Sequence, residues 1–339
     1  MQLHFIGGCM MGEINIVPYN PAYEERWDKF VLEKSANGTI LQTRKFLNYH
    51  PDDRFSDNSL LILKGSEIIG LIPANIVCKD KQKELKSHEG STFGGIIIEK
   101  RNIKISVLET VFNYIDQYCI QNSINKICLK MTSPLYSRED CELLDYMLFY
   151  HGYNSLLEVG YYVDFSKYED DIPKNYSSSV RRHFKASESN NLNYMELIDH
   201  RGISLFYDTL LDNYKKFGKK PVHSLEELFK LKDLLGNQIR FFGVFSGEEI
   251  VASSMVFDFL HRVFHTQYLA VKSAYNGLYV NESLYTNLIK TAKKEGFPYL
   301  SFGTATLDGG SRLNYNLAQY KEQYGTKQYV NRTYYKSFD

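Results

Sequence analysis

The sequence lacks the cysteine patterns of a metal site or a disulfide framework. Its cysteines are Cys9, Cys78, Cys119, Cys128 and Cys141. They form no CxxC pair and no Cys/His group at zinc spacing, and their number is odd. The simplest interpretation is a reduced, cytoplasmic protein that binds no metal.

Long hydrophobic runs are also missing. No stretch comes near the roughly 20 apolar residues that a membrane span needs. The amino end has no basic region followed by an apolar run, as a secretory signal would. We therefore expect no membrane span. Met10 or Met11 is a candidate for the true start, because a strand-like pattern begins directly afterwards.

The charge is not one-sided. Forty Lys and Arg stand against 40 Asp and Glu, which gives a net charge of zero at pH 7. Proteins that hold nucleic acid by neutralising phosphates need an excess of basic residues. The balance therefore argues against DNA as a partner and disfavours tRNA, although it is compatible with a local basic pocket.

Several catalytic motifs are absent. The sequence contains no G-x-S-x-G elbow and no Walker sequence. His261 and His265 are four residues apart, but they lie in a strand-like pattern and no Glu follows His261. These absences argue against a serine hydrolase, a nucleotide hydrolase and a zinc protease.

What the sequence does contain is an internal repeat. Ser59 to Val77 and Ile239 to Phe257 are each an apolar run, a Gly-x-Glu turn and a second apolar run. This pattern predicts two β-hairpins, with Gly65 and Gly247 in the turns. The length of 339 residues suits two domains of about 150 residues each.

The elements after each hairpin repeat as well. An amphipathic helix leading into a strand is predicted at Val107 to Met131 and at Asn281 to Gly303. A shorter helix and a last strand follow at Leu143 to Phe165 and at Asn316 to Phe338. The predicted fold class is α/β (α+β), with two units that each have a mixed, mostly antiparallel sheet flanked by helices.

A polar, acidic stretch separates the two copies. Residues 166–172 are followed by Pro173, so we place the domains at 13–165 and 166–339. Helical segments at 175–189, 202–217 and 224–235 precede the second sheet. The glycine pair of the first-half segment SHEGSTFGG is interpreted as a turn with close packing, because no phosphate signature accompanies it.

Ordered segments of the chain carry a family resemblance. They are SANGTILQTRKFLNYH, SSSVRRHFKAS, GVFSGEEIVASSMVF, HTQYLAV, NESLY, YLSFGTA and YKEQYG. The order of elements resembles the GNAT acyltransferase fold. Two such units in one chain resemble the Fem-type (FemABX) peptidyltransferases and the BioF2-like acetyltransferases.

The resemblance implies a function and a donor site. It implies an N-acyltransferase that uses acetyl-CoA or another acyl-CoA and needs no metal. The acceptor would be an amino group of an envelope or polysaccharide precursor, such as an amino sugar or a stem peptide. The donor would lie in the second domain, along Tyr268, Leu269, Val271, Gly277, Tyr279 and Asn281.

Candidate catalytic residues lie on two predicted helices. Glu282 is near a helix start, where it would relay a proton or simply favour the helix dipole. The resemblance places a tyrosine that protonates the leaving group near Tyr320 and Lys321. The alternative for that pair is a packed tyrosine and a solvated lysine.

Candidate substrate-binding residues are basic. Arg181, Arg182 and Lys185 gather positive charge on one predicted helix. They suit the diphosphate of a nucleotide-linked or lipid-linked acceptor, or they form a solvated basic face. Lys45 is a further candidate in the first half, next to Arg44.

Two other functions stay open. One is aminoacyl transfer from charged tRNA to a peptidoglycan precursor. The zero net charge argues against it, and so does the lack of sustained heptads, since Fem-type enzymes that use aminoacyl-tRNA often carry a coiled-coil insertion. The other is a noncatalytic saccharide-binding or peptide-binding protein on a degenerate fold. It is favoured by the segment KSAYNGLYVNE, which keeps only Gly277 of the Q/R-x-x-G-x-G/A phosphate loop.

Overall fold

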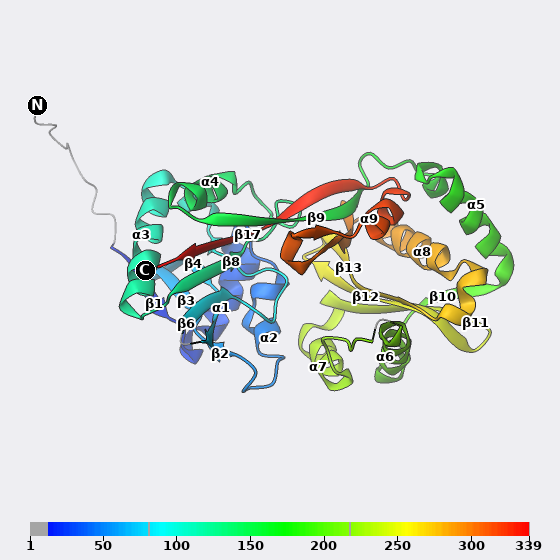
Figure 1. Ribbon diagram of the computed structural model, residues 1–339, viewed down its shortest axis with the longest axis horizontal. Helices are drawn as coiled ribbons and strands as arrows, with labels where there is room; N and C mark the ends of the chain where they lie inside the picture. Colours follow the sequence, from blue (N-terminus) through cyan, green and yellow to red (C-terminus); the bar gives the residue numbers. More distant parts are fainter. Residues whose placement is uncertain (1–12, 81, 217, 339) are drawn as a thin grey trace, which may run out of the picture. The chain divides into compact units, whose positions relative to one another are not determined.

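The computed structural model describes residues 13–80, 82–216 and 218–338 (Figure 1). Cys9 and both start candidates, Met10 and Met11, lie outside the described residues. The described chain forms two compact units. Unit 1 contains the residues before 48, residues 51–155 and those from 333 onward; unit 2 contains residues 48–50 and 156–332.

Unit 1 holds two groups of strands. The first is antiparallel, in the order β1-β3-β4-β7, with β1 (Ile14–Pro18), β3 (Leu60–Lys64), β4 (Glu67–Ile72) and β7 (Ile97–Ile98). The second has the order β8-β6-β5-β2, with β2 (Ser56–Asp57), β5 (Asn75–Lys79), β6 (Gln82–Ser87) and β8 (Lys126–Lys130). The end of β17 (Lys327–Ser337) pairs with β8.

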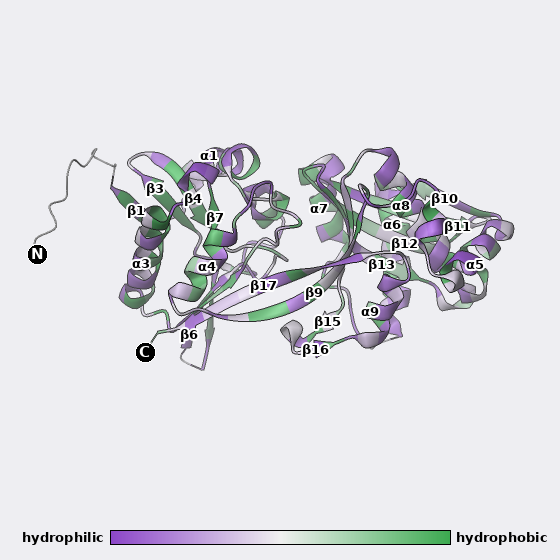
Figure 2. Ribbon diagram, turned by 90° about the horizontal axis from the view of Figure 1, so that it is seen from above, coloured by the Kyte–Doolittle hydropathy of each residue, from purple (hydrophilic) through white to green (hydrophobic). Residues whose placement is uncertain are grey.

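The first predicted hairpin is confirmed, with one correction. Gly65, at φ +60°, connects β3 to the hydrophobic strand β4 (Figure 2). The predicted second arm, however, is not one strand. It breaks after Ile72 and resumes at Asn75 as β5, with Pro73 between them. Proline has no backbone N–H to offer a ladder, which explains why pairing stops there.

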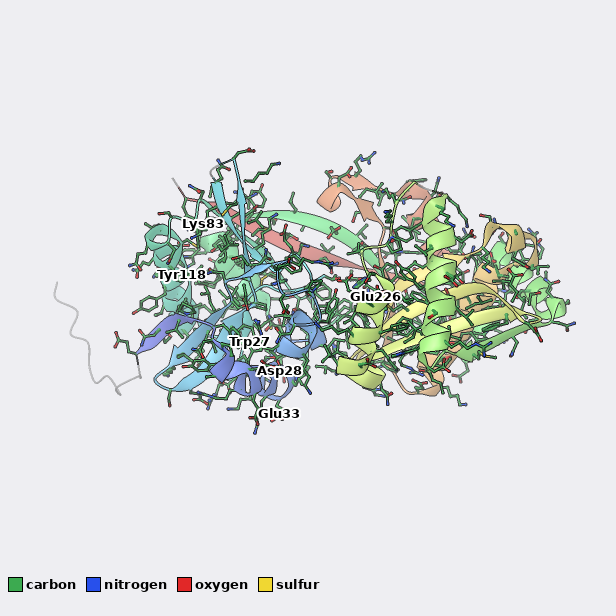
Figure 3. The ribbon with its side chains drawn as sticks, turned by 90° about the horizontal axis from the view of Figure 1, so that it is seen from below. Trp27, Asp28, Glu33, Lys83, Tyr118 and Glu226 are labelled. Carbon is green, nitrogen blue, oxygen red and sulfur yellow. The ribbon has the colours of Figure 1, made fainter. Side chains whose placement is uncertain are left out.

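Helices cover the core of unit 1. They are α1 (Glu24–Lys29), α2 (Arg44–Leu47), α3 (Ile105–Gln121) and α4 (Glu142–Tyr150). On α1, Trp27 is fully buried and its Nε1 donates to Gln42 O at 2.7 Å, while Asp28 accepts the backbone N–H of Arg44 (Figure 3). The apolar stripe of α3 packs onto the core that contains Ile127.

Unit 2 is built on six neighbouring strands of a mixed sheet. Their order is β10-β11-β12-β13-β14-β9, with β9 (Asn154–Asp164), β10 (Leu192–Glu196), β11 (Ile239–Ser246), β12 (Glu249–Phe259), β13 (Val263–Val271) and β14 (Tyr299–Thr304). Only the β13–β14 pair is parallel among these described neighbours. The predicted mixed, mostly antiparallel sheet is therefore confirmed. A small hairpin of β15 (Thr306–Leu307) and β16 (Arg312–Leu313) follows β14.

Helices lie on both faces of this sheet. Figure 1 shows α5 (Ser178–Ser187) and α8 (Val280–Lys294) on one face, and α6 (His200–Lys215) and α7 (Leu225–Leu235) on the other. The last helix, α9 (Tyr315–Glu322), comes after the small hairpin. The predicted helices are confirmed with shifted ends; Phe217, the last residue predicted for the second of them, lies outside the described residues.

Candidate functional site

The parallel strands of unit 2 separate after a short contact. Only Val263–His265 of β13 pairs with Tyr299–Ser301 of β14. Opposite β12, the register of β13 then shifts by one residue at Gln267. Such a bulge bends its strand away from regular pairing. The described end of β13 therefore forms no ladder with β14, and an edge of this kind can hydrogen-bond an extended ligand.

The end of β13 leads to the start of α8 through a 3₁₀ turn, Ser273–Leu278. Tyr279 caps α8 with φ +55°, a left-handed conformation that is rare for a bulky residue. By contrast, Gly277 has no positive φ, and an added Cβ would meet nothing within 4 Å. In this loop, the left-handed backbone conformation therefore belongs to Tyr279, and the predicted Gly277 does not adopt one.

A buried carboxylate stands at the first turn of α8. Glu282 is 8% exposed, and its Oε1 lies 3.5 Å from Nδ1 of His183 on α5. The His183 ring stacks on Tyr279 at 4.6 Å between centroids. A carboxylate at a helix start is favoured by the helix dipole. The structure thus groups the predicted residues Tyr279 and Glu282 with a histidine that the sequence did not single out. Asn281, on the same turn, is half-buried.

Lys321 is a buried amine. The residue is 4% exposed, and its Nζ donates to Gly303 O at 3.1 Å and Thr304 O at 2.7 Å. Gly303 has φ +69°, so glycine suits this position. Burial lowers the pKa of Lys321 to about 7. Lys321 is therefore not the solvated lysine of the alternative interpretation.

The two carbonyl oxygens determine which hydrogen-bonding positions of the Lys321 amine are occupied. In its neutral form, Lys321 uses both N–H groups on Gly303 and Thr304 and keeps one lone pair. In its charged form, the third N–H takes the place of that lone pair. Nearby, burial and then the charge of Lys321 lower the pKa of His265 to about 3, so this histidine is neutral near pH 7.

Tyr320 of α9 is half-buried and packs with the buried tyrosines Tyr285 and Tyr324. The hydroxyls of Tyr320 and Tyr324 lie 2.8 Å apart, and the ring of Tyr324 stacks on Tyr285 at 4.9 Å. Burial raises the pKa of Tyr320 and of Tyr324 well above the ordinary value, and the charge of Glu282 adds to the shift. These hydroxyls stay protonated near neutral pH, as a proton donor must.

The predicted donor residues of β13 face opposite ways. Leu269 and Val271 pack in the core under α8. The Tyr268 hydroxyl instead bonds to His223 Nδ1 at 2.7 Å, and His223 Nε2 lies 2.9 Å from the hydroxyl of Tyr49. The structure therefore does not bring Tyr268 together with the tyrosines around Glu282.

The predicted basic residues also have different surroundings. The Arg181 guanidinium donates to the carbonyl oxygens of Pro173, Lys174 and Tyr176, each at 3.1 Å, which ties down the turn before α5. Arg182 and Lys185 are exposed on the mostly hydrophilic helix α5 (Figure 2). Lys45 is exposed on α2 of unit 1.

Unit 1 contains a counterpart of the parallel junction. There, β6 pairs with β8 through four residues, Glu84–Ser87. The chain itself fills the position beyond, because Gly94 N donates to Lys130 O at 2.9 Å and Gly95 N to Ser87 Oγ at 2.8 Å. A Cβ at Gly94 would lie 2.0 Å from Ser87 O, so the interpretation of this glycine pair as a close-packed turn is confirmed.

The described residues contain neither a membrane-spanning helix nor a metal-binding cluster. Among them, no helix is both long and apolar enough to cross a bilayer. In the same ranges, no group of three or more His, Cys, Asp or Glu side chains is arranged to hold a metal ion. The cysteines of the described part, Cys78, Cys119, Cys128 and Cys141, are free thiols.

Comparisons with known proteins place the fold. Residues 179–322 match the family described as acetyltransferase (GNAT) domain. The chain is similar to the crystal structure of FemX, with 11% identity, 94% of this chain and 96% of that chain covered, and a TM-score of 0.69. It is similar to L-PGS from Bacillus licheniformis, with 13% identity, coverages of 94% and 92%, and a TM-score of 0.61.

A third similar structure is a tandem GNAT protein from the clavulanic acid biosynthesis pathway. The identity is 9%, the coverages are 96% and 98%, and the TM-score is 0.55. No curated protein matches the chain in a sequence search. The chain has the fold of the GNAT superfamily in a Fem-like, tandem arrangement, and its matched acetyltransferase domain supports an acyltransferase.

Proposed function

We propose that unit 2 transfers an acyl group from a thioester, first of all acetyl-CoA, to an amino group. The observation that carries the proposal is Lys321, a buried amine with a pKa of about 7 held by two backbone carbonyls. An amine can attack a thioester only after it has lost a proton, and a base with a pKa near the working pH is suited to remove it.

The divergence of β13 from β14 supports the position of the donor. The pantetheine arm of coenzyme A carries two amides, which suit the open strand edge beyond Gln267. The start of α8 lies after this edge and offers backbone N–H groups to an anion or a carbonyl. Leu269, Val271, Gly277, Tyr279 and Asn281 stay the predicted donor residues. Tyr268 stays a prediction as well, for the opposite face of β13.

The reaction needs one base and one acid. Lys321 accepts a proton from the acceptor amine, whose nitrogen forms a bond to the acyl carbon. The tetrahedral intermediate collapses as the bond from carbon to sulfur breaks. Tyr320, with Tyr324 as its hydrogen-bond partner, protonates the thiolate. Glu282 keeps its predicted role as a proton relay beside these tyrosines.

We base the proposed class of acceptor on the basic residues of α5. We propose an amino group of an envelope or polysaccharide precursor, with Arg182 and Lys185 binding an anionic part such as a diphosphate. Arg181 stabilises the turn before α5, because its guanidinium donates to the backbone carbonyl oxygens of Pro173 and Tyr176. Lys45 stays a separate prediction for unit 1. The reaction would take place in the cytoplasm, where acetyl-CoA is available.

Calorimetric titration with acetyl-CoA, followed by a thiol-release assay with amino-sugar acceptors, tests the proposal. We expect micromolar binding, worth about 8 kcal/mol, and release of free coenzyme A. Lys321→Met should bind the donor as before but turn over at least about tenfold more slowly. Lys294→Met removes an exposed lysine of α8 and is the matched control, expected to retain activity.

A second candidate is aminoacyl transfer from charged tRNA, as the resemblance to Fem-type enzymes implies. The similarity to FemX over 94% of the chain favours it. Activity that requires charged tRNA and is lost on RNase treatment would favour this donor over acetyl-CoA. Binding of acceptor without consumption of either donor would favour the noncatalytic alternative and contradict the proposal.

A further inference from the structure

The carbonyls that hold Lys321 belong to a bulge in β14. In the ladder with β9, Ser301 pairs with Tyr162 and Thr304 pairs with Gly160, so β14 has two residues where β9 has one. A bulge of this kind leaves its extra residue outside the ladder and redirects it. Gly303 lies in this bulge, and its carbonyl is therefore free to turn toward Lys321.

A short chain of hydrogen bonds holds the bulge in place. The backbone N–H of Gly303 donates to Ser301 Oγ at 3.1 Å, and the same Oγ lies 3.1 Å from the hydroxyl of Tyr329 on β17. Ser301 is completely buried, and Tyr329 is buried as well. The order of contacts runs from Tyr329 through Ser301 and Gly303 to the amine of Lys321.

The ring of Tyr329 is itself fixed by its neighbours. A Cβ added at Gly160 would lie 2.3 Å from Tyr329 Cζ, so the ring rests directly on the glycine backbone. Gly160 is the ladder partner of Thr304, which supplies the second carbonyl. Tyr162 packs edge-on against the Tyr329 ring at 6.1 Å. Tyr329 thus contacts a neighbour of each carbonyl that bonds to Lys321. Its hydroxyl lies near Ser301 Oγ, which accepts from Gly303 N, and its ring lies on Gly160, the ladder partner of Thr304.

We propose that Ser301 and Tyr329 are positioning residues, which aim the carbonyls of Gly303 and Thr304 and thereby the free lone pair of Lys321. This inference rests on the proposed function, in which that lone pair accepts the proton. Without the Tyr329 hydroxyl, Ser301 Oγ loses a partner that restrains it. The bulge then loosens, water reaches the amine, and the protonated form of Lys321 becomes easier to reach.

Tyr329→Phe and Ser301→Ala test the proposal in the full-length protein. Trace labelling of lysines with acetic anhydride across a pH series, read by mass spectrometry, gives the titration midpoint of Lys321 without any turnover. We expect a midpoint near 7 in the parent chain and one higher by about a pH unit or more in both variants. Tyr162→Phe, which removes a neighbouring hydroxyl and keeps the ring, should leave the midpoint unchanged.

The kinetic readout separates positioning from a general loss of structure. At pH 7, kcat for Tyr329→Phe should fall about fivefold or more while KM for the donor stays within about twofold. The lost activity should return as the pH is raised, because a larger fraction of Lys321 is then neutral. An unfolded or merely weakened variant would not recover in this way, and thermal unfolding of each variant checks its folding.

Two results would overturn the inference. One is an unchanged Lys321 midpoint in both variants; the other is a midpoint near the ordinary value in the parent chain. Failure of the proposed function gives a different pattern. In that case no thioester is consumed, yet the labelling still reports whether Ser301 and Tyr329 control the amine.

Discussion

At the scale of single residues, the proposed chemistry of unit 2 depends on the buried amine of Lys321. An ammonium loses hydration when it is buried, and two carbonyl dipoles replace only part of that hydration. Lys321 has this environment, whereas Lys336 of unit 1 lies 2.5 Å from the carboxylate of Asp116. Burial lowers the pKa of Lys321 to about 7, so this amine changes protonation near neutral pH.

The depressed pKa of Lys321 predicts a pH-dependent stability. Between pH 7 and about 10.4, the unfolded chain binds a proton at this lysine that the folded chain does not. Folding is therefore most penalised below pH 7, and the penalty disappears as the pH rises through this window. Relative to Lys321→Met, the parent chain should gain up to about 1.4 kcal/mol per pH unit. Urea unfolding of both proteins at pH 7 and pH 9 measures this, and an equal difference at both values contradicts it.

The proposed acid, Tyr320, gives a second prediction at this scale. Tyr320→Phe keeps the packed ring and removes the hydroxyl that bonds to Tyr324. We expect kcat to fall about tenfold or more with little change in donor KM, because proton transfer to the leaving group is used only in the transition state. Tyr194→Phe is the control, since its hydroxyl bonds to Thr291 elsewhere on α8. Equal losses in the two variants would remove Tyr320 from the mechanism.

Sequence reasoning located these residues but not their surroundings. YKEQYG placed Tyr320 and Lys321 on one helix, and the resemblance singled them out. The sequence alone also allowed a solvated lysine, because backbone carbonyls from Gly303 and Thr304 leave no side-chain signature. The stacking of His183 on Tyr279 escaped notice for the same reason, as it depends on how α5 packs against α8.

At the scale of elements, the two parallel junctions differ in what occupies them. In unit 2, the bulge at Gln267 separates β13 from β14. In unit 1, the turn with Gly94 and Gly95 is bonded to the ends of β6 and β8. An extended ligand cannot take hydrogen-bonding groups that the chain already uses. Among the described residues, the parallel junction of unit 2 therefore leaves the end of β13 without a ladder partner on its β14 side, whereas the corresponding position in unit 1 is bonded to the chain itself.

This difference predicts one acyl donor per chain. Titration with acetyl-CoA should give a stoichiometry near one, and a photoreactive donor should label peptides from unit 2 only. Amide exchange at Gly94 and Gly95 should be slow, since both N–H groups are bonded inside unit 1. Ser87→Ala removes the acceptor of Gly95 N and Lys130 N, which should speed that exchange. Label in unit 1, or fast exchange in the parent chain, is the contrary result.

Periodicity predicted the elements well and their interruptions poorly. The apolar spacing of α3 and α8 and the glycine turns of both hairpins are local features, and local features can be read from sequence. The bulge at Gln267 carries no comparable signal, because it depends on how β13 is held by β12. Pro73 was visible, yet its effect on the strand was missed.

At the scale of the whole molecule, the last two passages of the chain between its units fall inside strands, whereas residues 48–50 of unit 2 directly follow α2. The chain leaves unit 1 between Ser155 and Leu156, within β9, and it returns at Thr333, within β17. Neither point shows a change in composition, so the acidic stretch 166–172 was the natural place to predict a junction. The domain limits 13–165 and 166–339 stay a prediction, and the strand register argues for treating β17 as part of both units.

Truncation of the chain after Arg332 tests this view. The deletion removes the residues of β17 that pair with β8, the buried side chain of Tyr334 and the ion pair of Lys336. Burial of a large side chain alone is worth about 1.5–3 kcal/mol. We therefore expect the unfolding temperature of unit 1 to be several degrees lower than in the full chain, while unit 2 keeps its sheet and its affinity for the donor.

The single tryptophan makes this outcome measurable, because Trp27 is fully buried in unit 1 and reports on that unit alone. Its fluorescence transition should move to lower temperature in the truncated chain, with the donor titration of unit 2 unchanged. Lys336→Met in the full chain is the matched control: it removes the ion pair but keeps the ladder, and should shift the transition far less. An unchanged transition in the truncated chain would mean that β8 does not need β17. Loss of donor binding would mean that the end of the chain supports unit 2 instead.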